Sequence, residues 1–131
     1  MKLHIAYKNN SFAILDTERG IVSDFYNAAD FGIDKIDSLS FGYSRKLCYN
    51  EKNKNQYLFQ INIGDSENEK SLIFNSDFKI IDSGVDLQNI KSGLVPYVMS
   101  SSYSDLHITD FNGNKILDID NNFYNDYEYH D

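Results

Sequence analysis

The sequence contains few of the residues that mark specialised protein classes. Its 131 residues include one cysteine, one proline and no tryptophan. A single cysteine excludes an internal disulfide framework, and a single proline excludes a collagen-like or proline-rich composition. The first residues lack the apolar stretch of a secretory signal, and no apolar run approaches the roughly 20 residues that cross a bilayer. We therefore expect a cytoplasmic chain that does not enter a membrane.

Basic residues are also scarce. The chain has 12 Lys and Arg residues against 20 Asp and Glu residues, for a net charge of −8. Residues 1–60 contain eight bases and seven acids, whereas residues 61–131 contain four bases and thirteen acids. A negative field of this kind repels nucleic acids and anionic membranes and accelerates the encounter with a basic protein. We expect such a protein partner and no direct binding to nucleic acid.

Aromatic residues, in contrast, are abundant. Ten tyrosines and nine phenylalanines make up 15% of the chain. They provide enough apolar surface to build a core and argue against a disordered chain. The length fits one domain of ordinary size. We therefore expect a single domain over residues 1–131, in which residues 121–131 are a candidate flexible tail.

Alternating apolar and polar residues predict strands along most of the chain. Residues 3–7 and 12–15 flank a polar turn and predict an opening hairpin. Asn112-Gly113, between two alternating runs, predicts a second hairpin because both residues tolerate positive φ. Further strand patterns cover residues 39–43, 46–49, 57–63, 71–74 and 78–81. The predicted fold class is mostly β, a single antiparallel sheet domain with a meander that is barrel-like or sandwich-like, and α+β is the alternative.

Two segments have weak helix signals. Ser23-Asp24 is a candidate cap for a short helix over residues 25–31, with Gly32 as its stop. Residues 86–91, which end near Gly93, are a candidate for one or two helical turns. Helices this short depend on tertiary packing, so we expect one or two short helices at most.

Asparagine and aspartate are frequent enough to raise the question of calcium. Asp118, Asp120 and Asn122 have the spacing of the first three ligands of an EF-hand loop, but Phe123 stands where that loop requires glycine. The glycine of the set Asp110, Asn112 and Asn114 is likewise misplaced. The pattern is therefore typical of turns rich in Asx residues, and we expect neither a metal site nor a cofactor.

Nucleophilic catalysis has one candidate arrangement. Cys48 could act as a nucleophile with His107 as its base and Asp105 or Asp110 as the orienting acid. Cys48 lies inside an apolar strand pattern, where cysteine is ordinarily an inert core residue. His4 and His107 lie in predicted strands as hydrogen-bonded packing residues, and residues 100–104 form a serine-rich predicted loop. We expect no enzymatic activity.

The C-terminal residues combine acids with aromatic rings. Residues 118–131 contain five acids, four aromatic rings and no lysine or arginine. This pattern suits contacts to Lys and Arg on a partner, because tyrosines can be partly buried and still form hydrogen bonds. A disordered end and a final edge strand that packs its rings on the core remain open. The predicted partner-binding residues are Asp118, Asp120, Tyr124, Asp126, Tyr127, Glu128 and Tyr129.

In general character the whole chain, acidic, small and rich in Asn and Tyr, resembles the immunity proteins of bacterial polymorphic-toxin and contact-dependent growth inhibition systems. The resemblance implies a cognate toxin, often a nuclease with a basic cleft, which the protein binds and occludes without catalysis. A phage-encoded inhibitor or DNA mimic that acts on a nucleic-acid-binding enzyme is the alternative, and the neighbouring genes distinguish the two. The oligomeric state does not follow from the sequence.

Overall fold

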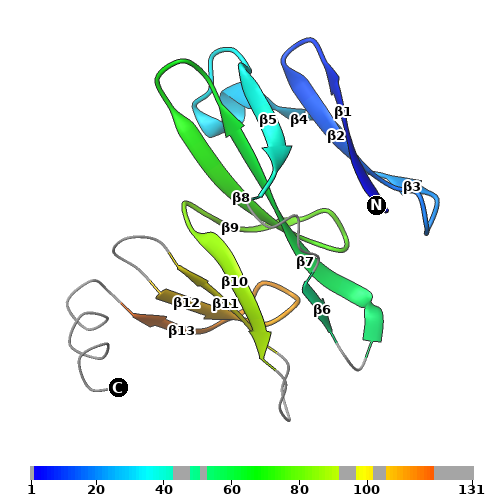
Figure 1. The fold of residues 1–131 in the computed structure, drawn as a ribbon, viewed down its shortest axis with the longest axis vertical. Helices are drawn as coiled ribbons and strands as arrows, with labels where there is room; N and C mark the ends of the chain where they lie inside the picture. The colour runs from blue at the N-terminus through cyan, green and yellow to red at the C-terminus, as the bar shows by residue number, and fades with distance from the viewer. Residues whose placement is uncertain (1, 43–47, 51–52, 92–96, 102–105, 120–131) are drawn as a thin grey trace. The chain divides into compact units, whose positions relative to one another are not determined.

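The computed structural model describes residues 2–42, 48–50, 53–91, 97–101 and 106–119 (Figure 1). In this part of the chain thirteen strands form three antiparallel sheets, and one short 3-10 turn is present. Each of these sheets is open, with an edge strand at either side. The prediction of a mostly β, antiparallel fold is therefore confirmed.

The N-terminal sheet contains β1 (Leu3–Lys8), β2 (Ser11–Asp16), β3 (Ile21–Val22) and β4 (Tyr26–Asn27), followed by the 3-10 turn η1 (Ala28–Phe31). The central sheet contains β5 (Ser38–Phe41), β6 (Cys48–Asn50), β7 (Asn53–Gly64), β8 (Glu69–Asn75) and β9 (Ile80–Ser83). The C-terminal sheet is a meander of β10 (Asp86–Lys91), β11 (Tyr97–Ser101), β12 (Leu106–Thr109) and β13 (Lys115–Ile119).

The chain divides into two compact units. Unit 1 contains residues 1–40 and 62–70, and unit 2 contains residues 41–61 and 71–131. Strands β5, β7 and β8 have residues in both units. The expectation of a single domain stays a prediction.

The opening hairpin of unit 1 is confirmed, and its turn explains its register. Lys8 lies opposite Ser11, and both residues between them, Asn9 and Asn10, have positive φ values of 50° and 62°. Two successive positive φ values define the type I′ turn, whose twist matches that of the flanking strands, and asparagine tolerates this conformation. The Asn10 side chain also donates to the carbonyl oxygen of Asp34 and accepts from the N–H of Ile36. Asn10 therefore holds a distant loop as well as its own turn.

This double role predicts different effects at two adjacent asparagines. Replacing Asn9 with glycine is expected to leave the free energy of unfolding within about 0.5 kcal/mol, since glycine accepts the same φ. Replacing Asn10 with glycine keeps the turn but removes two hydrogen bonds, and the expected loss is about 1–2 kcal/mol. Urea denaturation of the two variants measures the difference. Equal stability of the two variants would contradict the assigned role of the Asn10 side chain.

Residues 57–59 of β7 are buried on both faces of the strand within unit 2, which accounts for three apolar residues in succession. Leu58 packs on one face in a cluster with Ile73, Val85 and Phe111. Tyr57 and Phe59 alternate with it and are buried among other aromatic rings. Both faces of the central part of the strand are therefore covered by residues of the same unit, and neither face is exposed to solvent.

Gln60 joins β7 to β10 within unit 2. Its Nε2 atom donates to Oδ1 of Asp86 at 2.8 Å, and its Oε1 atom accepts from the N–H of Leu87 at 2.7 Å. The Oδ1 atom of Asp86 also accepts from Oγ of Ser71 at 3.3 Å. A buried amide is thus satisfied by side-chain and backbone partners, as burial requires.

Three local expectations are corrected. Residues 86–91 form strand β10, which pairs with β11, and not a helix. The helix expected over residues 25–31 is reduced to η1, which Asn27 caps and Gly32 ends at a φ of 75°. Ser100 and Ser101, expected in a loop, lie in β11, while residues 102–104 fall outside the described residues.

Candidate functional site

Of the predicted contact residues, the structure places only Asp118. It lies in β13, and its Cα atom is opposite that of His107 in β12. The remaining predicted contact residues lie outside the described residues: Asp120, Tyr124, Asp126, Tyr127, Glu128 and Tyr129. Their grouping stays a prediction from composition.

His107 forms the one described contact between a histidine and a carboxylate. Its Nδ1 atom lies 2.5 Å from Oδ2 of Asp82, and both side chains are largely shielded from solvent. Oδ1 of Asp82 accepts from the N–H of Ser83. His107 comes from β12 of the C-terminal sheet and Asp82 from β9 of the central sheet, and both residues belong to unit 2. The expectation of a hydrogen-bonded strand histidine is confirmed at this residue.

The partner of His107 differs from those expected for a catalytic arrangement. Asp82 is the acid that contacts His107, whereas the sequence suggested Asp105 or Asp110 for this role. Asp105 and the side chain of Cys48 lie outside what the structure describes, although the backbone of Cys48 is in β6 as expected. Asp82 was not found from the sequence because it is 25 residues away from His107 and belongs to another sheet.

Asp110 instead organises the second predicted hairpin. Its Oδ1 atom accepts from the N–H groups of Asn112 and Asn114, and its Oδ2 atom accepts from Nδ2 of Asn114. Burial alone would raise the pKa of Asp110, but these hydrogen bonds lower it below its ordinary value of 3.8. The oxygens are therefore engaged by donors of their own turn, which agrees with the Asx-turn interpretation.

The backbone angles of this turn correct one detail of the predicted hairpin, in which both Asn112 and Gly113 were expected to accept positive φ. Gly113 has a φ of 90°, whereas Asn112 is not among the residues with positive φ. The turn is closed by a hydrogen bond from the N–H of Asp110 to the carbonyl oxygen of Asn114. A Cβ atom at Gly113 would also lie 2.8 Å from Cγ2 of Ile81, so glycine is required both for φ and for space.

The lowered pKa of Asp110 predicts a pH-dependent contribution to stability. A carboxyl whose folded pKa lies below its unfolded value stabilises the fold above the unfolded value, near pH 3.8, and loses this effect as pH falls through the folded value. Asp110→Asn should therefore be less stable than the natural chain at pH 7, with a difference that shrinks between about pH 5 and pH 3. Urea denaturation across this range measures it. A difference that is constant over the range would contradict the assignment.

Unit 1 contains a group of exposed or half-exposed acids that the sequence analysis missed. Two segments supply them, residues 33–37 and residues 64–69, and the N–H of Asp37 donates to the carbonyl oxygen of Gly64. Oδ1 of Asp65 accepts from the N–H groups of Glu67 and Asn68, and these bonds lower the pKa of Asp65. We name as the acidic group of unit 1 the residues Asp34, Asp37, Asp65, Glu67 and Glu69.

The folded arrangement also redistributes the charge that the sequence placed in its second half. Unit 1 contains five bases and nine acids, and unit 2 contains seven bases and eleven acids. Each unit therefore has a net charge of −4. The net charges of the two units differ from those of residues 1–60 and 61–131 for two reasons. Residues 62–70, with three acids and one base, belong to unit 1, and the basic residues 41–61 belong to unit 2.

Comparisons of the chain with protein-family models, with curated proteins and with solved structures find no match in any of the three. Within the described ranges, no helix has the length and hydropathy of a membrane span. No group of three or more His, Cys, Asp and Glu side chains converges on a possible metal position in the same part of the chain.

Proposed function

We propose that this protein is a non-enzymatic inhibitor that acts in the cytoplasm by binding the basic surface of a partner protein, as an immunity protein binds its toxin. The observation that carries the proposal is the acidic excess of both units, each with a net charge of −4. Opposite charge on the partner accelerates the encounter, and repulsion between like charges disfavours the wrong partners. A nuclease, whose cleft must attract phosphates, is a partner of this kind.

The described turns support this proposal because they hold carboxylates in fixed positions. Asp65 and Asp110 each accept several hydrogen bonds from their own turns, and both have a lowered pKa. Both groups are therefore charged at neutral pH. A carboxylate that is already ordered loses little conformational entropy when a lysine or arginine binds beside it.

We keep the C-terminal acids and rings as the proposed contact surface. The acids Asp118, Asp120, Asp126 and Glu128 would pair with basic residues of the toxin. The rings Tyr124, Tyr127 and Tyr129 would provide buried contact area. Most of this surface lies outside the described residues, so its support is the composition of residues 118–131.

Two variants with the same net charge test the proposal. The first changes Asp118, Asp120, Asp126 and Glu128 to their amides, and the second does the same to Asp34, Asp37, Glu67 and Glu69. The partner is the adjacently encoded protein that arrests growth when it is expressed alone. Protection of growing cells reports function, and the Kd between purified proteins at several salt concentrations reports the electrostatic contribution.

We expect the first variant to weaken binding by about tenfold or more and to reduce its salt dependence, with a smaller effect of the second variant. Equal losses in both variants would assign the effect to total charge and refute the C-terminal contact surface. Unchanged affinity and salt dependence in both would refute binding through acidic residues altogether.

A further inference from the structure

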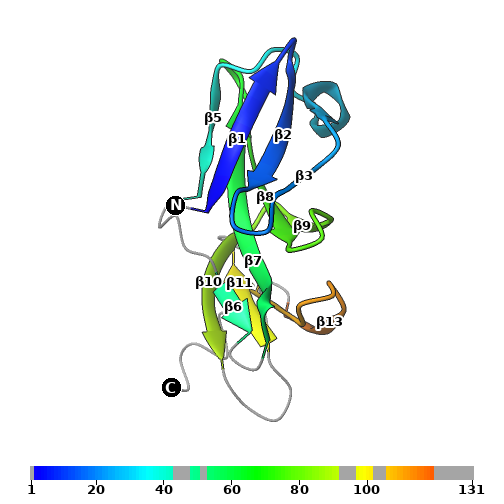
Figure 2. The same cartoon turned by 90° about the vertical axis from the view of Figure 1, so that its right-hand side faces the viewer.

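Residues 21–27 form an interrupted edge strand in unit 1. Leu15 and Phe12 of β2 lie opposite Val22 of β3 and Tyr26 of β4. Because β1 pairs along the whole of β2, both short strands lie on the side of β2 that faces away from β1 (Figure 1 and Figure 2). Among the described strands, none pairs with the outer side of this segment. We call its outer side the 21–27 edge.

The hydrogen bonds of Ser23 determine which backbone groups point outward. The N–H of Ser23 donates to the carbonyl oxygen of Ile14, and the Oγ atom of Ser23 accepts from the N–H of Ile14. Residues 14 and 23 are thus a hydrogen-bonded pair, so Leu15 and Val22 are a non-hydrogen-bonded pair. The N–H and C=O groups of Val22 therefore point away from β2, where another strand could bind them.

The side chains of the edge are unusually apolar for exposed residues. Ile21 is 41% exposed, Val22 63% and Phe25 56%. Soluble proteins commonly protect edge strands with lysine, and β1, the other edge of this sheet, ends with Lys8. The 21–27 edge has no lysine or arginine. An apolar edge with outward-facing peptide groups is suited to strand addition.

The charge of the segment determines the kind of strand that fits. Asp24 is exposed between Val22 and Phe25, and Asp30 is exposed in the following turn. No base occurs from Gly20 to Asp34. A partner strand with basic side chains would face these carboxylates favourably, whereas a second copy of this acidic chain would bring like charges together.

We propose that the 21–27 edge binds an extended segment of a partner protein that carries alternating apolar and basic side chains. The partner's backbone pairs with the peptide groups of Val22, its apolar side chains cover Val22 and Phe25, and its basic side chains lie near Asp24. This proposal does not rest on the inhibitor function, because its geometry is that of unit 1 alone.

The test uses the full chain and a capped eight-residue peptide of alternating valine and lysine, with the same peptide containing glutamate in place of lysine as its control. Backbone amide NMR signals report where each peptide binds. We expect saturable shifts confined to residues 21–27 with the lysine peptide, weaker binding at high salt, and no binding of the glutamate peptide. Shifts at another sheet edge, no saturation, or equal binding of both peptides would overturn the proposal.

Two variants at position 22 test the backbone contact. Val22→Pro removes the outward N–H but no bond to β2, and proline is tolerated at such an edge position. It should weaken binding of the lysine peptide about tenfold, while Val22→Thr keeps the N–H and should bind nearly as the natural chain does. Equal binding by both variants would overturn the backbone contact.

A charge reversal keeps the proposal testable if the proline variant does not fold. Asp24→Lys should bind the glutamate peptide better than the lysine peptide, because the favourable charge pairing is exchanged. An unchanged preference for lysine would overturn the proposed role of Asp24. Shifts at residues 21–27 that grow with protein concentration in the absence of peptide would show self-association and overturn the choice of partner.

Discussion

Replacing Phe59 with alanine should destabilise unit 2 by about 3–5 kcal/mol. Phe59 is 1% exposed. Its ring is stacked on Phe74 with centroids 5.3 Å apart, and the rings of Tyr57, Phe41 and Phe78 surround it at 5.9, 6.3 and 6.4 Å. The substitution removes buried apolar surface and leaves a cavity that rigid neighbouring rings cannot readily fill.

Two control variants separate this effect from the loss of any aromatic ring. Phe25 is 56% exposed, so Phe25→Ala should change the free energy of unfolding by no more than about 0.5 kcal/mol. Phe59→Leu refills part of the cavity and should cost about 1–2 kcal/mol. Urea unfolding followed by circular dichroism and tyrosine fluorescence measures all three variants. A loss below about 1 kcal/mol for Phe59→Ala would contradict the central position of this ring.

The parts of the fold that the sequence predicted are those set by local patterns. The opening hairpin follows from alternation on either side of a polar turn, and its two asparagines allow the φ values that the turn requires. The part of strand β7 over residues 57–63 follows from its apolar and alternating residues, whereas its polar start at Asn53 was not predicted. In each case a short segment contains the information that determines its conformation.

The predictions from the sequence are wrong where residues that are distant in the sequence determine the local conformation. Leu87 and Ile90 have a spacing compatible with a helix, yet residues 86–91 pair with β11, and Gln60 accepts from the N–H of Leu87. Phe78 adopts a φ of 62° without being glycine, in a turn where Asn75 accepts two backbone hydrogen bonds. The ring of Phe78 packs edge-on against that of Phe59, with centroids 6.4 Å apart. Gln60 and Phe59 are distant in sequence from Leu87 and Phe78, whereas Asn75 belongs to the same turn as Phe78.

The same limit applies to the candidate sites. The sequence indicated an acidic protein and an Asx-rich turn at Asp110, but its counts by halves missed the acidic group of unit 1, which needs residues 62–70 to fold with residues 1–40. The 21–27 edge was missed for a related reason. Residues 25–31 were expected to be helical, and only the pairing of β3 and β4 with β2 leaves an apolar edge exposed.

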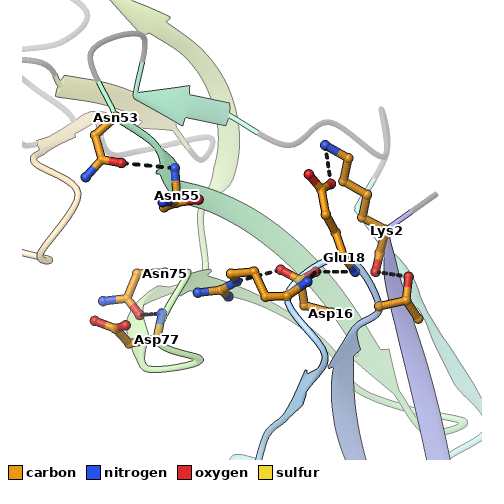
Figure 3. A network of polar contacts seen from close by, with 9 residues as sticks. Lys2, Asp16, Glu18, Asn53, Asn55, Asn75 and Asp77 are labelled. Carbon is orange, nitrogen blue, oxygen red and sulfur yellow. Dashed lines mark hydrogen bonds and ion pairs between the residues drawn. The ribbon is translucent and has the colours of Figure 1, made fainter.

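Asp16 is expected to give the largest polar effect on the stability of unit 1. Its carboxylate is buried: Oδ1 accepts from the N–H groups of Glu18 and Arg19, and Oδ2 accepts from Nε of Arg19 at 2.8 Å (Figure 3). Glu18 in turn forms an exposed ion pair with Lys2. Asp16→Ala should cost about 2–3 kcal/mol, because the turn between β2 and β3 loses its acceptor and Arg19 loses its partner.

A set of variants divides this effect between the turn and the ion pair. Asp16→Asn keeps a side-chain acceptor for the turn and removes the charge, so it should cost about 1–2 kcal/mol, and Arg19→Gln should cost about 1 kcal/mol. If the charges act on each other, the double variant should cost less than the sum of the two single variants. Exactly additive costs would mean that the turn hydrogen bonds alone explain why a carboxylate is buried here. The exposed pair of Lys2 and Glu18 provides the comparison, since Lys2→Gln should change stability by less than about 0.5 kcal/mol.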